Sequence, residues 1–305
     1  AILEHTRDVY YLGEKELAVL YSDHVDLFNY AGEKIIKCIA ISEIRNDIYL
    51  GLLSRFGQIK RMCLNSLELS KRSHPSRCMK LLSGDEVVGI QVLTGNSDLM
   101  VITNTGYASL YNENELTVIG AKAGGVKSIT GLGKSQAVSL IAFDEEEKSK
   151  IVLVTDKGHE RILDNTKVMR TQRLGKTTQV MPCFKSDMHD VVAAVKVPSR
   201  VDSIILNLCL SDFTTIQATI DDLHLTDINK YAKKNMEIPA KSKILSANDA
   251  CMETVDKTTI SHPILVKEKP VKEEEIVEEN EAVEEVEDKK EDASFEQISI
   301  FDDLD

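Results

Sequence analysis

The sequence predicts an all-β protein: a propeller-like array of about five four-stranded blades, followed by a disordered acidic tail. Three observations predict this fold. A strand, a tight turn and a second strand recur along the chain; a second strand marker keeps step with them; and most of the negative charge lies near the end. We therefore expect a β-domain over residues 1–262 and a tail over residues 263–305.

The turn repeat is clearest in three copies. Each copy is an apolar run, then Ser or Thr, two variable residues, a glycine and a second extended segment. Apolar and β-branched residues suit a buried strand, and glycine supplies the positive φ that closes a short turn. Each copy therefore predicts a β-hairpin. The copies occupy residues 50–61, 99–110 and 151–162, with the glycine at Gly57, Gly106 and Gly158.

Two weaker copies flank these three. Residues 20–25 have Val25 in the place of the glycine, and residues 208–214 have Thr214 there. The five markers are 32, 49, 52 and 56 residues apart. Units of this length hold about four strands, the size of one propeller blade.

A second marker supports the same period. Apolar strands begin 30, 31 and 33 residues after the three glycines, at Val87, Ala137 and Val191. Two markers that keep step through three units indicate a radial array of small antiparallel sheets. The chain has no Trp, which argues against propellers built on a Trp-Asp signature.

The net charge of −13 is unevenly distributed. Residues 266–305 contain 17 acidic and 5 basic residues and so carry −12, whereas residues 1–265 are nearly neutral at −1. The tail is also poor in aromatic residues until its end, a composition typical of disordered segments. The acidity of the whole chain therefore does not exclude nucleic acid as a partner of the β-domain.

Several other classes of protein are disfavoured. No apolar run is long enough to span a membrane, so no membrane partner is expected. The six cysteines include no C-x-x-C pair and the seven histidines no H-E-x-x-H pair, so we expect reduced thiols in a cytoplasmic protein and no metal site. The chain begins with Ala1 and shows no secretory signal, which favours a piece of a longer protein.

The residues after the turns resemble a known family. Gly57–Arg61, followed by Gly84–Val88, is similar to the blade pattern G-x-x-K-R-T and G-D-E-V-V of bacterial gyrase and topoisomerase IV A subunits. Ile119–Ile129 is similar to the family's R-x-x-x-G-V-x-x-I segment, with Lys122 where the family often has Arg. The resemblance covers residues 9–250. The chain therefore resembles the C-terminal domain of a type IIA DNA topoisomerase A subunit.

The resemblance implies a β-pinwheel, a propeller-like disc whose blades exchange strands and whose rim bends or wraps duplex DNA. In gyrase, wrapping uses a Gln-Arg-Arg-Gly-Gly-Lys-Gly box, which this sequence lacks; Gln172–Lys176 keeps only fragments of it. This departure favours topoisomerase IV, with gyrase as the alternative. The resemblance also implies two partners, a second A subunit together with an ATPase B subunit. They would complete a heterotetramer that relaxes and decatenates DNA, with a cytoplasmic, nucleoid-associated location.

We expect no enzymatic activity from this chain alone. The family's DNA-cleaving tyrosine follows an arginine in a different, upstream domain, and this sequence has no Arg-Tyr pair. No other group of residues indicates a catalytic site, and no cofactor is implied for the fragment.

Clustered bases between the turns and the next strands are the candidate DNA contacts. DNA phosphates attract lysine and arginine, and this attraction needs a local basic stripe rather than a basic net charge. Contacts to phosphate do not read bases, so binding is expected to be largely independent of DNA sequence. The candidates are Lys60, Arg61, Lys71, Arg72, Arg77 and Lys80 in the densest cluster, Arg161, Lys167, Arg170, Arg173 and Lys176 in a second, and Lys122 with Lys127 in a third.

Two alternatives stay open. Lys230, Lys233 and Lys234 in the last unit suit DNA contacts and ordinary solvated side chains equally well. A protein-binding propeller, from a different class, would explain the repeats without assigning any role to the basic clusters.

The tail suggests two further hypotheses. Its acidic run would compete with DNA for the basic rim and so tune binding. Its last apolar stretch, Gln297–Phe301, resembles the Q-x-S-L-F peptide that binds the bacterial sliding clamp, which adds the clamp as a candidate partner.

Overall fold

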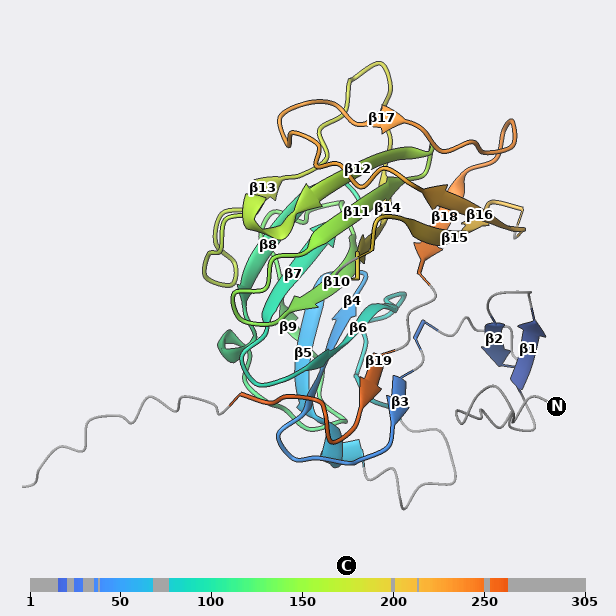
Figure 1. Ribbon diagram of the computed structural model, residues 1–305. Coiled ribbons are helices and arrows are strands. Elements are labelled where there is room, and N and C mark those ends of the chain that lie inside the picture. Colours follow the sequence, from blue (N-terminus) through green and yellow to red (C-terminus); the bar gives the residue numbers. More distant parts are fainter. Residues whose placement is uncertain are drawn as a thin grey trace, which may run out of the picture. The chain divides into compact units, whose positions relative to one another are not determined.

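The computed structural model confirms the all-β class (Figure 1). No helix in the described part of the chain is long and apolar enough to cross a membrane. The tail, with both of its hypotheses, lies outside the described residues. The structure describes residues 16–20, 25–29, 36–37, 39–67, 77–198, 201–212, 214–249 and 253–262.

Three antiparallel sheets have four strands each. Each is built around one predicted hairpin, and its third strand begins at the predicted second marker, at Val87, Ala137 or Val191. In strand order, the sheets are β6 (Val87–Leu93), β4 (Tyr49–Ser54), β5 (Gln58–Cys63) and β9 (Val126–Lys127); β10 (Ala137–Phe143), β7 (Asp98–Thr103), β8 (Tyr107–Asn112) and β13 (Thr178–Gln179); and β14 (Val191–Lys196), β11 (Lys150–Thr155), β12 (His159–Asp164) and β17 (Lys233–Lys234).

The blade count differs from the prediction of about five. A fourth sheet has three strands, in the order β16 (Thr215–Ile220), β15 (Ile204–Leu210) and β18 (Ile244–Asn248). Within the described residues, the first predicted unit forms a hairpin of β1 (Glu16–Leu20) and β2 (Val25–Asn29), with no further strand paired to it. Only 19 residues separate β2 from β4, whereas 34 separate β5 from β7, so the first unit lacks the chain that the others use for further strands.

The sheets exchange strands, as the resemblance implied. β9 follows β7 and β8 in sequence but pairs with β5 of the preceding sheet. β13 and β17 pair with β8 and β12 in the same way. Each exchanged strand is reached by a connection that we call an exchange loop. The exchange loops are residues 116–125, 168–177 and 221–232, and residues 77–82 are the described part of their counterpart in the preceding unit.

Exchange loops attach to the hairpins in the same register each time. In each hairpin, the backbone carbonyl of the residue four positions after the turn glycine accepts a hydrogen bond from the incoming exchange loop. These bonds are Ile119 N to Arg61 O at 3.0 Å, Thr171 N to Leu110 O at 2.9 Å and Thr226 N to Ile162 O at 2.7 Å. The exchanged connection is therefore a repeated structural unit.

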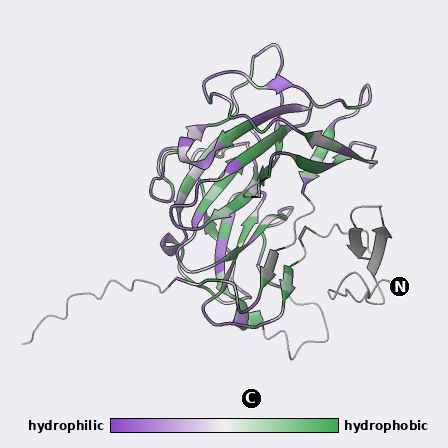
Figure 2. Cartoon of the chain, in the orientation of Figure 1, coloured by the Kyte–Doolittle hydropathy of each residue, from purple (hydrophilic) through white to green (hydrophobic). Residues whose placement is uncertain are grey.

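Apolar residues pack between successive sheets. Separate buried clusters join the first sheet to the second, the second to the third and the third to the fourth. Strand centres are hydrophobic and most connections hydrophilic (Figure 2). On the other face of the first sheet, β3 (Ile39–Ile41) and β19 (Glu253–Val255) pair in parallel and pack against β4. The segment before the first four-stranded sheet thus pairs with the segment after the last sheet. We call these two segments, residues 39–47 and 253–262, the clasp.

Candidate nucleic-acid interface

Lys60 does not face solvent, and its prediction as a DNA contact is wrong. It lies on β5 with a side chain that is 1% exposed. Its Nζ donates to the carbonyls of Cys78, Ala121 and Ala123 at 2.7, 2.8 and 3.1 Å. Burial lowers the pKa of this ammonium group. Lys60 therefore holds an exchange loop against the hairpin rather than a phosphate.

Arg161 occupies the same position in the third sheet, three residues after the turn glycine, and its prediction is wrong for the same reason. The side chain is fully buried. Nη1 donates to Asp227 O at 2.5 Å and Nη2 to Lys230 O, both in the exchange loop of residues 221–232. In the second sheet this position is Ser109, which is also buried. Two of the three hairpins thus bind their exchange loop through an inward-facing cation.

Arg61 is the third predicted contact that the structure buries. Its Nε and the Glu113 Oε2 form an ion pair at 2.8 Å, although their orientation is not that of a hydrogen bond. The guanidinium also lies over the Tyr49 ring, 4.2 Å from its centroid. The other Glu113 oxygen accepts from the backbone of Gly95 and Ser97 at 2.9 and 2.7 Å. Arg61 Nη1 also donates to Glu113 O and Asn114 Oδ1 at 3.3 and 3.0 Å. Arg61 is thus buried at 3% exposure and paired inside the protein, which makes its prediction as a phosphate contact wrong.

The remaining described candidates lie on or beside the exchange loops with accessible side chains. Lys167 is at the end of a short 3-10 helix, η5 (Asn165–Lys167), that leads into one loop. Arg173 is half-buried and the others are exposed. Lys71 and Arg72 lie outside the described residues. The accessible candidates are Arg77, Lys80, Lys122, Lys127, Lys167, Arg170, Arg173 and Lys176.

Successive exchange loops touch one another, so bases far apart in sequence come together. Lys80 N donates to Ala123 O at 3.1 Å, which places Lys80 beside the loop that carries Lys122. Arg173 Nη1 donates to Lys127 O at 2.6 Å. The three predicted clusters therefore meet in one surface, which we call the exchange-loop surface. It is defined by Arg77, Lys80, Lys122, Lys127, Arg170, Arg173 and Lys176.

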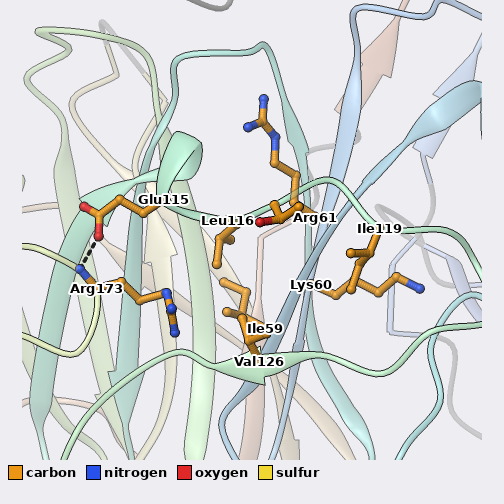
Figure 3. Close-up of a pocket in the computed structure, with 9 residues that line it drawn as sticks. Ile59, Lys60, Arg61, Glu115, Leu116, Ile119, Val126 and Arg173 are labelled. Atoms are coloured by element: carbon orange, nitrogen blue, oxygen red, sulfur yellow. Dashed lines mark hydrogen bonds between the residues drawn. The ribbon is translucent and has the colours of Figure 1, made fainter. Parts of the chain in front are cut away.

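Acidic side chains set the geometry of this surface without neutralising it. Arg170 pairs with Asp98 at 3.1 Å but is 53% exposed, so its charge stays accessible. Glu115 accepts from the backbone of Arg173 at 2.5 Å, and both residues line a small pocket (Figure 3). Burial raises the pKa of Tyr111, which interacts with both charges, far above its ordinary value, so its hydroxyl stays protonated. Arg170 and Arg173 are thus held by short contacts, while the side chain of Arg170 stays exposed.

One feature of this region escaped prediction from the sequence, namely a stacked pair of half-exposed rings, Phe184 and Tyr231. It lies beside Lys230, Lys233 and Lys234, the lysines that the sequence left open as DNA contacts, which are exposed. The strand exchange that brings them to the third sheet has no local signature, because β17 is only two residues long. Only the family resemblance implied that exchange.

Comparisons with known proteins agree with this architecture. The family described as DNA gyrase C-terminal domain, beta-propeller, matches residues 50–94 and 97–148. The A subunit of DNA topoisomerase 4 from Bacillus subtilis strain 168 is 28% identical over 161 residues, which cover 53% of this chain and 20% of that protein. The chain thus aligns with about a fifth of the length of this relative.

Two solved structures share the fold. The C-terminal domain of DNA topoisomerase IV has a TM-score of 0.62 at 22% identity, over 70% of this chain and 65% of that one. The DNA gyrase A C-terminal domain has a TM-score of 0.58 at 13% identity, over 78% and 82%. Both solved structures thus share the fold of this chain, and the matching family and relative carry the names of the same two enzymes, DNA gyrase and DNA topoisomerase 4.

Proposed function

We propose that this chain binds and bends duplex DNA as the C-terminal domain of a topoisomerase IV A subunit. The observation that carries the proposal is the exchange-loop surface, where accessible bases from three clusters meet. Direct hydrogen bonds join their segments, from Lys80 N to Ala123 O and from Arg173 Nη1 to Lys127 O on β9. Such a surface suits phosphates, which need positive charge along a path rather than base-specific groups. Its bases lie on loops anchored to rigid hairpins, so they would hold DNA along a fixed curve.

The test compares two triple variants in a DNA-binding titration with labelled duplex. Lys122→Ala, Lys127→Ala and Lys176→Ala remove three bases of the exchange-loop surface. The control replaces Lys148, Lys241 and Lys257, which are equally exposed but lie outside it. We expect at least about tenfold weaker binding for the first variant, since each phosphate contact contributes to counterion release. Equal affinities of the two variants would overturn the proposal and favour a protein-binding module.

For the parent protein, we propose the role that the family resemblance implies. The domain would position the transported duplex, while a second A subunit joins with an ATPase B subunit to complete the heterotetramer that relaxes and decatenates DNA. This chain contributes the DNA-binding surface and no chemistry. Decatenation by the parent enzyme, with and without the three exchange-loop substitutions, tests the role. Unchanged decatenation would contradict it.

Gyrase is the alternative, and one observation favours testing it. Gln172–Lys176, which keeps fragments of the gyrase wrapping box, lies on an exchange loop that contacts Lys127 and Thr130, just after the preceding exchange loop. A topology assay separates the two enzymes: DNA closed by ligase around this chain should gain supercoils of one hand if the chain wraps DNA chirally. We expect no such bias, because the box is incomplete. A consistent change in linking number would assign the chain to gyrase.

A further inference from the structure

Two histidines and an aspartate converge at the third sheet, although the sequence showed no metal motif. His159 begins β12, while Asp187 and His189 lie 28 and 30 residues later in the loop before β14. One ligand atom from each lies within 4.8 Å of the others. The two imidazole rings stack with centroids 4.3 Å apart. The fold therefore assembles a group of ligands that no local spacing could reveal.

The hydrogen bonds of His189 leave one ring nitrogen as a buried lone pair. Its Nδ1 is 3.0 Å from the carbonyl oxygen of Asp187, which only accepts, so Nδ1 carries the hydrogen. In the neutral ring Nε2 then has no hydrogen. This atom is buried and has no hydrogen-bond partner among the described residues. A backbone carbonyl that fixes one nitrogen while the other stays bare is the usual arrangement of a metal-binding histidine.

His159 brings a second imidazole to the same place. Its ring Nδ1 lies 3.4 Å from the Thr155 hydroxyl, and its Nε2 lies 3.0 Å from Asp187 Oδ2. With a hydrogen on Nε2 this contact is a hydrogen bond; a metal ion would replace that hydrogen and bind Nε2 and Oδ2 together. Lys157 Nζ neutralises only the other oxygen, Oδ1, at 3.0 Å.

We propose that His159 Nε2, His189 Nε2 and Asp187 Oδ2 bind a divalent transition-metal ion, with Zn²⁺ as the best fit. Two imidazoles and one carboxylate suit zinc, whereas Mg²⁺ and Ca²⁺ prefer an all-oxygen shell. Zinc bonds of about 2.0–2.2 Å place tetrahedral ligand atoms about 3.4 Å apart. The His159 Nε2–Asp187 Oδ2 pair, now at 3.0 Å, would open slightly, and atoms up to 4.8 Å apart would close. Asp187 is 45% exposed, which leaves a path for the ion and a fourth position for water. The ion would fasten the loop of residues 181–190 to β12.

The test is metal binding by the whole chain, prepared without a polyhistidine tag and stripped with a chelator. Titration with Co²⁺ should give the visible absorption of a low-coordinate site at one equivalent, and Zn²⁺ should displace it. His189→Gln should weaken zinc binding at least about tenfold. His224→Gln is the matched control, because His224 is exposed and pairs with Asp222 alone. It should bind like the wild-type chain.

Two outcomes would overturn the proposal: no Co²⁺ or Zn²⁺ uptake by the wild-type chain, or equal zinc affinity of the wild-type and His189→Gln chains. Asp187→Asn serves as a second variant if His189→Gln fails to fold. Cys183→Ser checks the nearby thiol, which contacts Met188. Loss of binding in Cys183→Ser with retention in His189→Gln would also contradict the assignment. No DNA is present, so the result is independent of the proposed function.

Discussion

Two groups of lysines and arginines in this chain differ in burial: buried ones that bind protein groups, and accessible ones on the exchange-loop surface. Lys60, Arg61 and Arg161 are at most 3% exposed, and each binds protein carbonyls or a carboxylate. Lys122, Lys127 and their neighbours on the exchange loops are accessible. Burying a cation is costly unless it is paired or hydrogen-bonded. Lys60 and Arg161 accordingly donate to backbone oxygens, and Arg61 pairs with Glu113.

Replacing Lys60 by methionine tests this division. Methionine has a side chain of similar length but leaves the carbonyls of Cys78, Ala121 and Ala123 without their hydrogen-bond donor. We expect the free energy of unfolding to fall by about 1–3 kcal/mol in urea titration. Lys127→Met, at an exposed position, should change it by less than about 0.5 kcal/mol. Similar losses in both variants would show that Lys60 does not anchor the exchange loop.

Sequence reasoning could not separate the buried from the accessible bases. Lys60 and Lys122 both follow a glycine-containing motif in a basic stretch, and both looked equally suited to phosphates. What differs is whether an exchange loop from later in the chain covers the residue. That contact joins residues 60 and 121, and nothing in the local sequence marks it.

At the scale of the element, the repeated unit is a hairpin whose turn is shaped for an exchanged strand. Gly57, Gly106 and Gly158 all have φ near +76 to +80°. Their carbonyls accept from the segment that arrives, as in Val180 N to Gly106 O at 2.8 Å. A Cβ at Gly106 would lie 2.5 Å from the carbonyl oxygen of Met181. The glycine thus serves both the turn and the close approach of the exchanged strand.

Alanine at two glycines separates these roles. Gly84 has φ of +75°, but a Cβ there meets nothing within 4 Å, so Gly84→Ala should cost only the backbone strain, about 1 kcal/mol. Gly106→Ala adds the clash with Met181 and should cost clearly more. Thermal or urea denaturation of both variants measures the difference. Equal costs would mean that the exchanged segment moves aside freely.

The hairpins and the third strands could be predicted because their signals are local. Apolar runs, turn glycines and starts at Val87, Ala137 and Val191 all agree with the observed strands. The exchanged strands could not be seen in the sequence, since two residues carry no periodicity. Their presence came only from the family resemblance.

At the scale of the whole β-domain, the clasp joins residues from both ends of the array. Arg45 donates to the carbonyls of Asp256 and Thr259 and to both carboxylate oxygens of Asp47. Ser261 donates to the same carboxylate. These contacts add to the parallel pairing of β3 with β19. The clasp therefore covers the face of the first sheet that no further blade packs against among the described residues.

The clasp should weaken in acid. Hydrogen bonds from Arg45 and Ser261 lower the pKa of Asp47 from its ordinary 3.8 to about 2. A lowered pKa stabilises the folded state above pH 3.8, and this contribution is lost as the pH falls through about 2. Unfolding titrations of wild type and Asp47→Asn should therefore differ most above pH 4 and converge toward pH 2. In chains that also carry Arg45→Met, the change in stability caused by Asp47→Asn should depend less on pH. A change in stability that does not vary with pH in either background would contradict the role of the clasp.

We expect the accessible bases of the exchange-loop surface to contact phosphates and the buried bases not to, and the salt dependence of DNA binding distinguishes the two groups. The logarithm of the binding constant falls with the logarithm of salt concentration by about 0.9 for each phosphate contact. The Lys122, Lys127 and Lys176 alanine variant should therefore have a shallower slope than wild type by about 2 to 3, on any duplex sequence. Lys60→Met, measured below its unfolding transition, should keep the wild-type slope. An unchanged slope in the triple variant, or an equal reduction in Lys60→Met, would contradict the account.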